Sequence, residues 1–551
     1  MWKISQLLKI RHRYAKNGKT LKSLQAAFGI TSSLLKDGFN LLDTSPWRDR
    51  SSSNSTWTIC PETWKGMKHG YPFYFTGFEV DDCPYAKNLS DTVTIVLDGR
   101  NRTEAEINSI AYLIHEQHPG LTMILASDRD YQPSQKFKAY VKIVKMDKQA
   151  KDGDVWNSLI EKVSTLYTFV ARAGGLTFFD EDTRLHRLIR MIEYTDASIV
   201  GGSHKNETGH WKMGCYQSVM RNYAFRLVEG YDLAYNSCVY CDYISGPFLA
   251  KTSLLKSAFN SDLDGDFVFL DAFEKWRNLT AAVCPDAVFF TKFISGLETT
   301  TREDWIPFCR RWEINSVELP DKSKHTLTCN EMHSNCRKVK GMTTQPCCLQ
   351  ELSEMLRFLF RTCEDKNIGC EVEGGTEVGA VKLYGTLPWE LDADLNYVGW
   401  NHTIFKELKD HFKKAGYTLD TEEVPKCKPV SEKKSVNCGY WALRSKHWRI
   451  ELWGANQLAG WKLIDKGIKE PTRVLLDGEW LRAYPNPVLA VRNLYGDDIF
   501  EHVEHWISLG YGTSWRPYKT GSFLPCTSPG HHACLDQYLP VGNLQFLDTW
   551  L

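Results

Sequence analysis

The sequence lacks an excess of either charge. Its 551 residues include 67 lysines and arginines and 67 aspartates and glutamates, so the net charge at neutral pH is zero. A nucleic-acid-binding domain usually carries a basic surplus, and a disordered chain has few aromatic residues. Here aromatic residues make up 13% of the chain and include 19 tryptophans. The composition therefore argues against nucleic acid binding and disorder, and predicts a globular protein of two or three domains.

A long hydrophobic run is also missing. Residues Met1 to Asn40 are basic and mildly amphipathic, with leucines such as Leu7 and Leu24 spaced among polar residues. A signal peptide core and a membrane span both need a longer uninterrupted apolar stretch. The N-terminal residues therefore give no recognisable membrane anchor or secretion signal.

Cysteines and glycosylation sequons are abundant. The chain has 17 cysteines, some of them close in sequence, such as Cys427/Cys438 and Cys526/Cys534. Asn-x-Ser/Thr sequons occur at Asn54, Asn88, Asn101, Asn206, Asn278 and Asn401. Disulfides and N-linked glycans both belong to an oxidising secretory compartment. The sequence therefore predicts a luminal protein, and a disulfide-closed loop at Cys526 and Cys534.

The stretch from Cys370 to Tyr397 concentrates acidic residues. Glu390, Asp392 and Asp394 alternate with Leu391, Ala393 and Leu395. In an extended strand this alternation places all three carboxylates on one face, where they repel one another. A divalent cation relieves that repulsion, and Mg²⁺ or Mn²⁺ suits carboxylates that share the ion with substrate phosphates.

Glycines precede the acids, and a further acid follows them. Gly374, Gly375 and Thr376 form a strand-to-helix turn at which backbone N–H groups can approach a phosphate closely. Glu451 lies among apolar neighbours in the segment from Trp448 to Trp453, where strand alternation turns it to the opposite face. We therefore expect a nucleotide-handling metal site with Glu451 as an additional ligand.

These motifs resemble known families. A Gly-Gly turn followed by an Asp-x-Asp strand resembles the nucleotidyltransferase fold of the DNA polymerase beta superfamily. Gly374-Gly375-Thr376, Gly379-Ala380 and Pro388-Trp389 together resemble the LicD family, especially its animal fukutin-related branch. The resemblance runs from about Cys329 to the C-terminus. Glu390 and Glu451 stand where the family usually has Asp, and Lys382 where it usually has Arg.

The LicD resemblance implies a function. It implies that residues 326–551 form a nucleotidyltransferase-like catalytic domain that transfers a phosphorylated alcohol, of the ribitol 5-phosphate or phosphocholine type, from a CDP-linked donor to a glycan hydroxyl on a glycoprotein. Mg²⁺ or Mn²⁺ would be held by Glu390, Asp392, Asp394 and Glu451, and Lys382 would add positive charge near the phosphates. Family members are type II Golgi membrane proteins, which implies the Golgi or another secretory lumen and membrane association of the native form.

Four cysteines precede this domain. Cys329 and Cys336 are followed by the adjacent pair Cys347 and Cys348. Adjacent cysteines bridge each other only with strain, and four thiolates are natural ligands of a structural Zn²⁺. The arrangement resembles a zinc loop of the family, here residues 329–348. Two disulfides are the alternative interpretation.

The N-terminal half predicts a separate α/β domain. We expect residues 1–90 to be a leader and stem, and residues 91–325 to begin with a βαβ unit whose strands lie at Thr94–Asp98 and Leu121–Ala126 and whose helix lies at Glu104–His118. The strand Leu176–Phe179 runs into Asp180-Glu181-Asp182, which resembles the Asp-x-Asp of GT-A glycosyltransferases.

Two interpretations of this acidic turn stay open. The GT-A-like stem of the fukutin-related branch is thought to be non-catalytic, and the acids could instead cap a helix that includes Leu185 and Leu188. This domain could also mediate homo-oligomerisation. The fold class predicted for the whole chain is α/β with α+β character: a GT-A-like domain followed by a nucleotidyltransferase-like catalytic domain.

Two other functions compete with the phosphotransferase. One is a non-catalytic luminal scaffold or carbohydrate-binding protein, and the other is a glycosyltransferase that acts through the N-terminal domain. Leu349 to Leu359 predicts a helix beneath the catalytic sheet, and His402 to Lys414 predicts another that ends near Gly416.

Overall fold

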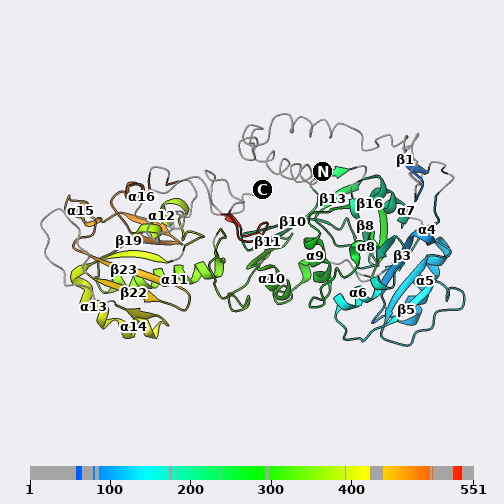
Figure 1. The fold of residues 1–551 in the computed structure, drawn as a ribbon, viewed down its shortest axis with the longest axis horizontal. Coiled ribbons are helices and arrows are strands. Elements are labelled where there is room, and N and C mark those ends of the chain that lie inside the picture. The colour runs from blue at the N-terminus through cyan, green and yellow to red at the C-terminus, as the bar shows by residue number, and fades with distance from the viewer. Residues whose placement is uncertain are drawn as a thin grey trace. The chain divides into compact units, whose positions relative to one another are not determined.

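The computed structural model describes residues 58–64, 78–80, 83, 86–172, 176–180, 183–195, 197–231, 233–235, 238–292, 297–339, 341–390, 392–421, 439–496, 499–500 and 525–535 (Figure 1). The chain divides into two compact units. The first comprises Met1–Val219, Phe225–Trp312 and Val317–His325, and the second comprises Met220–Ala224, Glu313–Ser316 and Thr326–Leu551. Helices and strands are mixed in both units, which confirms the predicted α/β class.

A large mixed sheet forms the centre of the first unit. Its main path runs β12 (Ala234–Tyr235), β13 (Cys238–Cys241), β16 (Thr280–Thr291), β8 (Ala197–Asn206), β15 (Phe248–Lys251), β6 (Tyr167–Val170), β3 (Val93–Asp98), β4 (Thr122–Ser127) and β5 (Val141–Lys145), with β7 (Leu176–Phe178) on β16 and β9 (Trp211–Lys212) on β8. Strands β3 to β6 pair in parallel, whereas β15 is antiparallel to both of its neighbours.

Smaller elements complete this part of the chain. The helices are α4 (Leu89–Thr92), α5 (Glu104–Gln117), α6 (Asp152–Glu161), α7 (Leu185–Tyr194), α8 (Thr252–Leu255), α9 (Asp266–Lys275), η1 (Leu297–Thr299) and α10 (Ile306–Trp312). A second sheet has the order β14 (Tyr243–Ile244), β10 (Cys215–Arg221), β11 (Ala224–Glu229), β17 (Ser316–Glu318) and β18 (Lys324–Thr326), and β1 (Glu62–Trp64) pairs with β2 (Phe78–Val80).

The predicted βαβ unit is confirmed as β3, α5 and β4. Helix α5 begins at a capping box, in which Glu106 N donates to Thr103 Oγ1 and Thr103 N donates to the Glu106 carboxylate. Its Ile107 and Ile110 pack into the same core as Ile95 of β3. Nearly every residue of β3 and β4 is buried, as the continuous apolar run of a parallel strand predicts.

The second unit contains a five-stranded sheet of order β19 (Cys370–Glu373), β20 (Ala393–Val398), β23 (Arg449–Ala455), β22 (Tyr440–Arg444) and β21 (Thr418–Asp420). Around it are α11 (Pro346–Asp365), α12 (Gly374–Leu383), η2 (Gly399–Asn401), α13 (His402–Glu407), α14 (Lys409–Lys414), α15 (Trp461–Ile464), α16 (Pro487–Tyr495) and the hairpin of β24 (Arg473–Leu476) and β25 (Glu479–Arg482). The helix predicted at Leu349–Leu359 is therefore confirmed within the longer α11.

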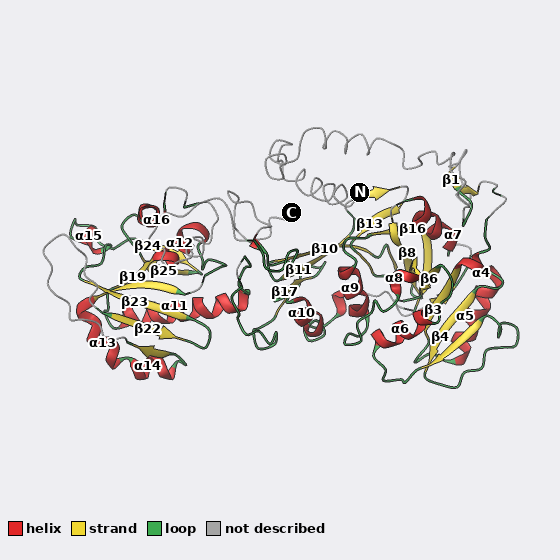
Figure 2. Ribbon diagram, in the orientation of Figure 1, coloured by secondary structure: helices red, strands yellow, loops and turns green. Residues whose placement is uncertain are grey.

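The two faces of this sheet differ in chemistry. Val372, Leu395 and Leu452 are aligned across β19, β20 and β23, and they share one core with Leu352 and Leu356 of α11. Figure 2 draws α12 and α16 near β19, and α13 and α14 near β22. Asp394, which precedes Leu395 on β20, approaches Gly374 at the start of α12. Because side chains alternate along each strand, the residues between these apolar positions face the α12 side.

Two local predictions need correction. The helix expected from His402 to Lys414 is broken at Leu408 into α13 and α14, although Gly416 does follow it with a φ of +88°. The acidic strand is also shorter than expected, because β20 begins at Ala393. Glu390 and Asp392 therefore precede the strand. The prediction that one extended strand carries all three carboxylates on the same face is wrong.

Each unit contains disulfides between its own cysteines. They join Cys60–Cys83, Cys215–Cys241, Cys238–Cys284, Cys329–Cys347, Cys336–Cys348, Cys363–Cys370 and Cys526–Cys534. The loop predicted at Cys526 and Cys534 is thus confirmed, whereas Cys427 and Cys438 lie outside the described residues. Among the helices that the structure describes, none combines the length and apolar composition needed to cross a membrane.

Candidate active site

A row of carboxylates crosses the polar face of the second unit's sheet. Asp394 of β20 lies directly opposite Glu451 of β23 in the parallel pairing. On its other side, Asp394 is paired with Glu373 of β19. Directly opposed residues on neighbouring strands project to the same face with their Cβ atoms about 5 Å apart. The structure therefore brings the predicted Asp394 and Glu451 together and adds Glu373, which the sequence analysis did not identify.

The glycine turn leaves space for two of these acids. Gly374 has a φ of +60°, and a Cβ added there would lie 3.2 Å from Asp394 Oδ2. A Cβ on Gly375 would lie 2.9 Å from Glu390 Oε2. Glu390 is 4% exposed. The two carboxylates thus approach the first turn of α12, where the helix dipole favours negative charge.

Thr376 connects the same turn to the acidic strand. Asp394 N donates a hydrogen bond of 2.9 Å to Thr376 Oγ1. The Tyr495 hydroxyl of α16 lies 3.4 Å from the position of a Gly374 Cβ, so the C-terminal end of α16 packs beside the acids.

The acids perturb one another electrostatically. Burial first, and then the charges of Asp392 and Glu451, together raise the pKa of Asp394 to about 7, while Trp453 Nε1 donates to its Oδ1 at 3.4 Å. Burial also raises the pKa of Glu451, against the lowering effect of Arg449. Without a cation, the folded protein holds these carboxylates at a cost, since like charges in a partly desolvated site repel one another.

Two basic side chains approach the acids. Arg449 Nη2 lies 3.4 Å from Asp392 Oδ2 and also forms an ion pair with Glu451. Burial lowers the pKa of Lys338 to about 8, and the charges of Asp392 and Glu390 oppose that shift. Lys338 lies in the loop before α11, whose cysteines the sequence analysis assigned to zinc or to two disulfides.

Lys382 occupies a different place from the one expected. It lies in the last turn of α12, whereas the glycine turn is the first. Eight residues of helix separate Gly374 from Lys382, which is about 12 Å along the axis. Lys382 is therefore placed away from the helix N-terminus at which we expected phosphate, and Lys338 and Arg449 are the cations beside the acids.

A second group of buried acids lies next to this row. Burial raises the pKa of Glu377 to about 8, and Tyr484 N donates to Glu377 Oε1 at 3.3 Å. Burial likewise raises the pKa of Glu373, whose carboxylate accepts from the Tyr484 hydroxyl at 3.5 Å. Glu371 accepts from the backbone N–H groups of Ala459 and Gly460 at 2.9 and 3.0 Å. Alternation along Glu371-Val372-Glu373 was the available signal for these acids.

Asp477 holds the loop between α12 and the acids. Its carboxylate accepts from Thr386 Oγ1 at 2.7 Å and from Ser353 Oγ at 2.5 Å, and its backbone N donates to Tyr384 O at 2.8 Å. Thr386 lies in the same loop, four residues before Glu390. The β24–β25 hairpin thus fixes the segment that delivers Glu390 and Asp392.

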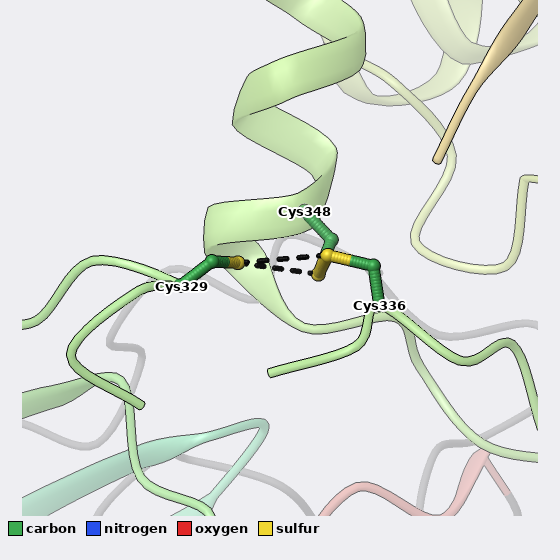
Figure 3. A group of neighbouring side chains, drawn as sticks. All are labelled: Cys329, Cys336 and Cys348. Carbon is green, nitrogen blue, oxygen red and sulfur yellow. Dashed lines mark hydrogen bonds between the residues drawn. A yellow bond between two sulfur atoms is a disulfide. The ribbon is translucent and has the colours of Figure 1, made fainter. Parts of the chain in front are cut away.

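The four-cysteine loop differs from the zinc prediction. Cys329 is bonded to Cys347 at the start of α11. Cys336 is bonded to Cys348, and this bond is drawn in Figure 3. Zn²⁺ binds thiolates, and a sulfur in a disulfide has no thiolate to offer. The sulfurs of Cys329, Cys336 and Cys348 do lie within 4.8 Å of one another, but in this oxidised form they do not fit zinc. The alternative of two disulfides is the arrangement that the structure has.

Asp180, the described acid of the first unit's acidic turn, neither caps α7 nor follows a parallel strand. Helix α7 begins after Arg184, without an acid in its first turn. Thr183 Oγ1 donates to Val288 O at 3.3 Å, and the capping interpretation is therefore wrong. Asp180 follows β7, which pairs antiparallel with β16, and Asp182 lies outside the described residues.

An arginine lies at the carboxyl edge of the parallel strands in the first unit's sheet. In open α/β sheets, ligands bind beyond the carboxyl ends of the parallel strands. Arg172 follows β6 at that edge, is 2% exposed, and lies 2.8 Å from Asp266 Oδ1 and 2.8 Å from the Tyr243 hydroxyl. A fixed guanidinium paired to the nearest acid does not favour a metal–nucleotide site there.

Comparisons with known proteins give limited matches. No protein-family model matches the chain. Ribitol 5-phosphate transferase FKRP of Mus musculus is 36% identical over 56 residues, which are 10% of this chain and 11% of that protein. Similar solved structures include TarS of S. aureus, with a TM-score of 0.28, 12% identity, and coverage of 40% of this chain and 38% of that one. They also include GalNAc-T7 with UDP, GalNAc and Mn²⁺, with a TM-score of 0.32, 9% identity, and coverage of 64% and 65%.

Proposed function

We propose that the chain is a glycan-modifying transferase whose second unit moves a phosphorylated alcohol, of the ribitol 5-phosphate or phosphocholine type, from a CDP-linked donor to a glycan hydroxyl on a glycoprotein. The observation that carries this proposal is the pairing of Asp394 with Glu451 beside the glycine turn of α12. The short similarity to a ribitol 5-phosphate transferase supports the same chemistry.

The residues present fit a divalent cation. Asp392, Asp394 and Glu451 would hold Mg²⁺ or Mn²⁺, since hard cations prefer carboxylate oxygens. Burial and the neighbouring negative charges raise the pKa of Asp394, and a bound cation would offset both effects. When bound, such an ion neutralises charge on the donor's diphosphate. Glu390, which is buried against Gly375, would be a further ligand of this cation.

The reaction consists of one displacement at phosphorus. The oxygen of the acceptor hydroxyl attacks the phosphorus that carries the alcohol, a new P–O bond forms, and the bond from that phosphorus to CMP breaks. CMP leaves with the bonding electrons, and the hydroxyl proton passes to solvent or a nearby carboxylate. The chain contributes orientation and electrostatic stabilisation, which suffice for much of the rate enhancement in phosphoryl transfer.

Calorimetric titration of the full chain with Mn²⁺ plus CDP, UDP or GDP tests the proposal. We expect CDP to bind best, in the presence of Mn²⁺ only. A preference for UDP or GDP would favour a glycosyltransferase acting through the first unit, and no binding of any nucleotide would favour a non-catalytic scaffold.

We place the reaction in the Golgi or another secretory lumen. The disulfides support this compartment, as do the exposed sequons at Asn88, Asn101 and Asn278. Membrane association of the native protein and homo-oligomerisation through the first unit are part of the same proposal, and each follows from the resemblance to LicD proteins.

A further inference from the structure

The loop before α11 carries a cation toward the acids. Lys338 follows Cys336 by two residues, and Cys336 is bonded to Cys348 in the first turn of α11. Lys338 Nζ lies 3.9 Å from the centroid of the Trp448 ring. The lysine interacts electrostatically with Asp392 and Glu390, two of the acids of the candidate active site.

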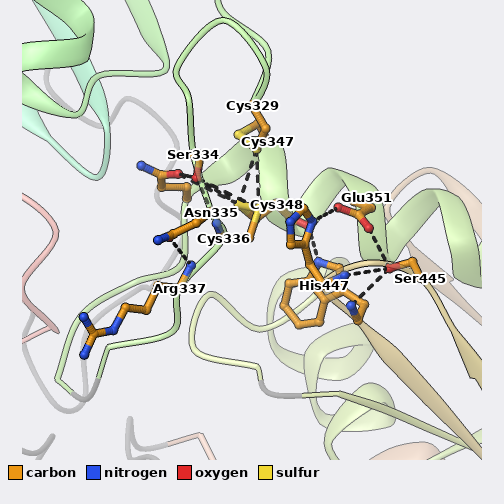
Figure 4. A network of polar contacts seen from close by, with 12 residues as sticks. Cys329, Ser334, Asn335, Cys336, Arg337, Cys347, Cys348, Glu351, Ser445 and His447 are labelled. Carbon is orange, nitrogen blue, oxygen red and sulfur yellow. Dashed lines mark hydrogen bonds and ion pairs between the residues drawn. A yellow bond between two sulfur atoms is a disulfide. The ribbon is translucent and has the colours of Figure 1, made fainter.

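The aromatic platform beneath this lysine is rigid. Trp448 is 3% exposed, and its Nε1 donates to Cys348 O at 2.7 Å. Its backbone N donates to Ser445 Oγ at 3.0 Å, and Ser445 Oγ donates to Glu351 Oε1 at 2.6 Å. His447 Nδ1 lies 2.7 Å from Glu351 Oε2, so Ser445, His447 and Glu351 form one network (Figure 4).

The positions of disulfide, tryptophan and lysine are therefore coupled. The Cys336–Cys348 bond fixes the loop to α11, and α11 fixes Trp448 through the Cys348 carbonyl. Trp448 in turn offers a ring face to the ammonium group, an attraction of about 0.5–2 kcal/mol that grows with desolvation. The neighbouring Arg337 is exposed and extends away from the Glu351–His447 pair in Figure 4. Lys338 is half-buried, lies over Trp448 and interacts with the acids, whereas Arg337 is exposed.

A partly buried ammonium group among metal-binding acids is suited to phosphate. Arg449 already pairs with Asp392 and Glu451, so Lys338 is the second cation at this edge of the site. Lysine binds phosphate as a point charge, whereas arginine binds in a planar, bidentate manner. Lys382, the lysine expected to do this from the sequence, lies at the far end of α12.

We propose that Lys338 binds a phosphate group of the nucleotide-linked donor and that the disulfide-closed loop of residues 329–348 positions it. This inference rests on the proposed function. It gives the two disulfides a role in the reaction, because they hold the cation that meets the donor.

The test compares Lys338→Gln, Lys338→Arg and the matched control Arg337→Gln in the full chain. We expect Lys338→Gln to weaken binding of CDP in the presence of Mn²⁺ by about tenfold and to raise KM for CDP-ribitol more than it lowers kcat, whereas binding of Mn²⁺ alone stays unchanged. Lys338→Arg should recover most of the affinity because the charge is kept. Arg337→Gln should behave as wild type.

A second comparison tests the loop. The double variant Cys336→Ser/Cys348→Ser should weaken CDP binding in the wild-type background and weaken it no further when Lys338 is already Gln, since both changes remove one contact. Wild-type affinity for CDP in a folded Lys338→Gln variant overturns the inference. Failure of the wild-type chain to bind any nucleotide overturns the proposed function instead, so the two failures are distinguishable.

Discussion

Asp394 and Glu451 are separated by more than fifty residues of sequence and lie directly opposite each other in the sheet. At the scale of single residues, alternation placed Asp394 and Glu451 opposite their apolar neighbours, but it did not hold for Glu390, which precedes β20. Alternation along Glu371-Val372-Glu373 indicated a polar face, but the sequence could not place Glu373 beside Asp394, because that depends on the pairing of β19 with β20. Lys338 was missed for a similar reason, since its loop meets Trp448 only after folding.

The Asp394 carboxyl predicts a pH dependence of stability in the metal-free protein. Its pKa is about 7 in the folded chain, above its value of about 3.9 in an unfolded one. Between these values the folded state binds more protons, so stability is highest below about pH 4 with respect to this group and falls as the pH rises through 7. Asp394→Asn should remove this dependence and raise the stability at pH 8 by an amount on the order of 1–3 kcal/mol.

Chemical denaturation of wild type and Asp394→Asn at pH 5 and pH 8, both in a chelator, measures this difference. Parallel stability profiles of the two proteins would mean that Asp394 is not held in a strained, charged state.

Substitution of Gly375 tests whether this glycine leaves the space that the Glu390 carboxylate occupies. A methyl group at this position would meet the Glu390 carboxylate at 2.9 Å, so Gly375→Ala should displace that acid and lower transfer at least tenfold. Glu390→Asp shortens the side chain by one methylene, and the combined variant should regain part of the activity. Assays of CMP release, with a melting curve for each variant, check this. A combined variant that is additive in its loss would show that the two positions do not meet.

At the scale of elements, the regular parts of both units were predictable. The strands β3 and β4 follow from continuous apolar runs, because nearly every residue of each is buried. The helices α5 and α11 follow from apolar periodicity, because each buries one face. The break at Leu408 and the late start of β20 were not, since both depend on packing that a periodic pattern does not encode. The same holds for the cysteine loop, where spacing allowed zinc or disulfides and folding selects which sulfurs meet.

The pairing in this loop predicts its metal content and its stability. Protein purified without reductant should contain no stoichiometric zinc, because the four sulfurs form Cys329–Cys347 and Cys336–Cys348. Cys329→Ser/Cys347→Ser should lower the free energy of unfolding by about 2–4 kcal/mol through loss of the cross-link. Elemental analysis measures the zinc content, and peptide mapping without reductant identifies the disulfides. One zinc per chain with four free thiols would contradict the disulfide assignment and restore the original expectation.

At the scale of the whole molecule, the exposure of each sequon asparagine predicts whether it can be glycosylated. Asn88, Asn101 and Asn278 are exposed, whereas Asn401 is 9% exposed at the start of α13. Protein made in animal cells should therefore shift downward on a gel after enzymatic deglycosylation, and Asn401→Gln should leave the shift unchanged. An unshifted wild-type protein would count against the secretory compartment and, with it, the disulfides.

We expect the two units to differ in function, because their candidate sites differ in chemistry. The first unit has a buried Arg172–Asp266 pair at the edge where an α/β sheet would bind a ligand, and the second has the carboxylate row of Glu373, Asp394 and Glu451. We therefore expect Asp180→Asn in the first unit to leave transfer intact. The chemistry of the whole chain should depend on the second unit.

The most direct test measures CMP release from CDP-ribitol by the full chain with Mn²⁺ and a glycan acceptor, comparing wild type with Asp392→Asn and Asp394→Asn. The account predicts that each variant folds, melts no lower than wild type without metal, loses the stabilisation by Mn²⁺ plus CDP, and releases CMP at least a hundredfold more slowly. Near-normal CMP release by either folded variant would contradict the assignment of this carboxylate row as the catalytic centre.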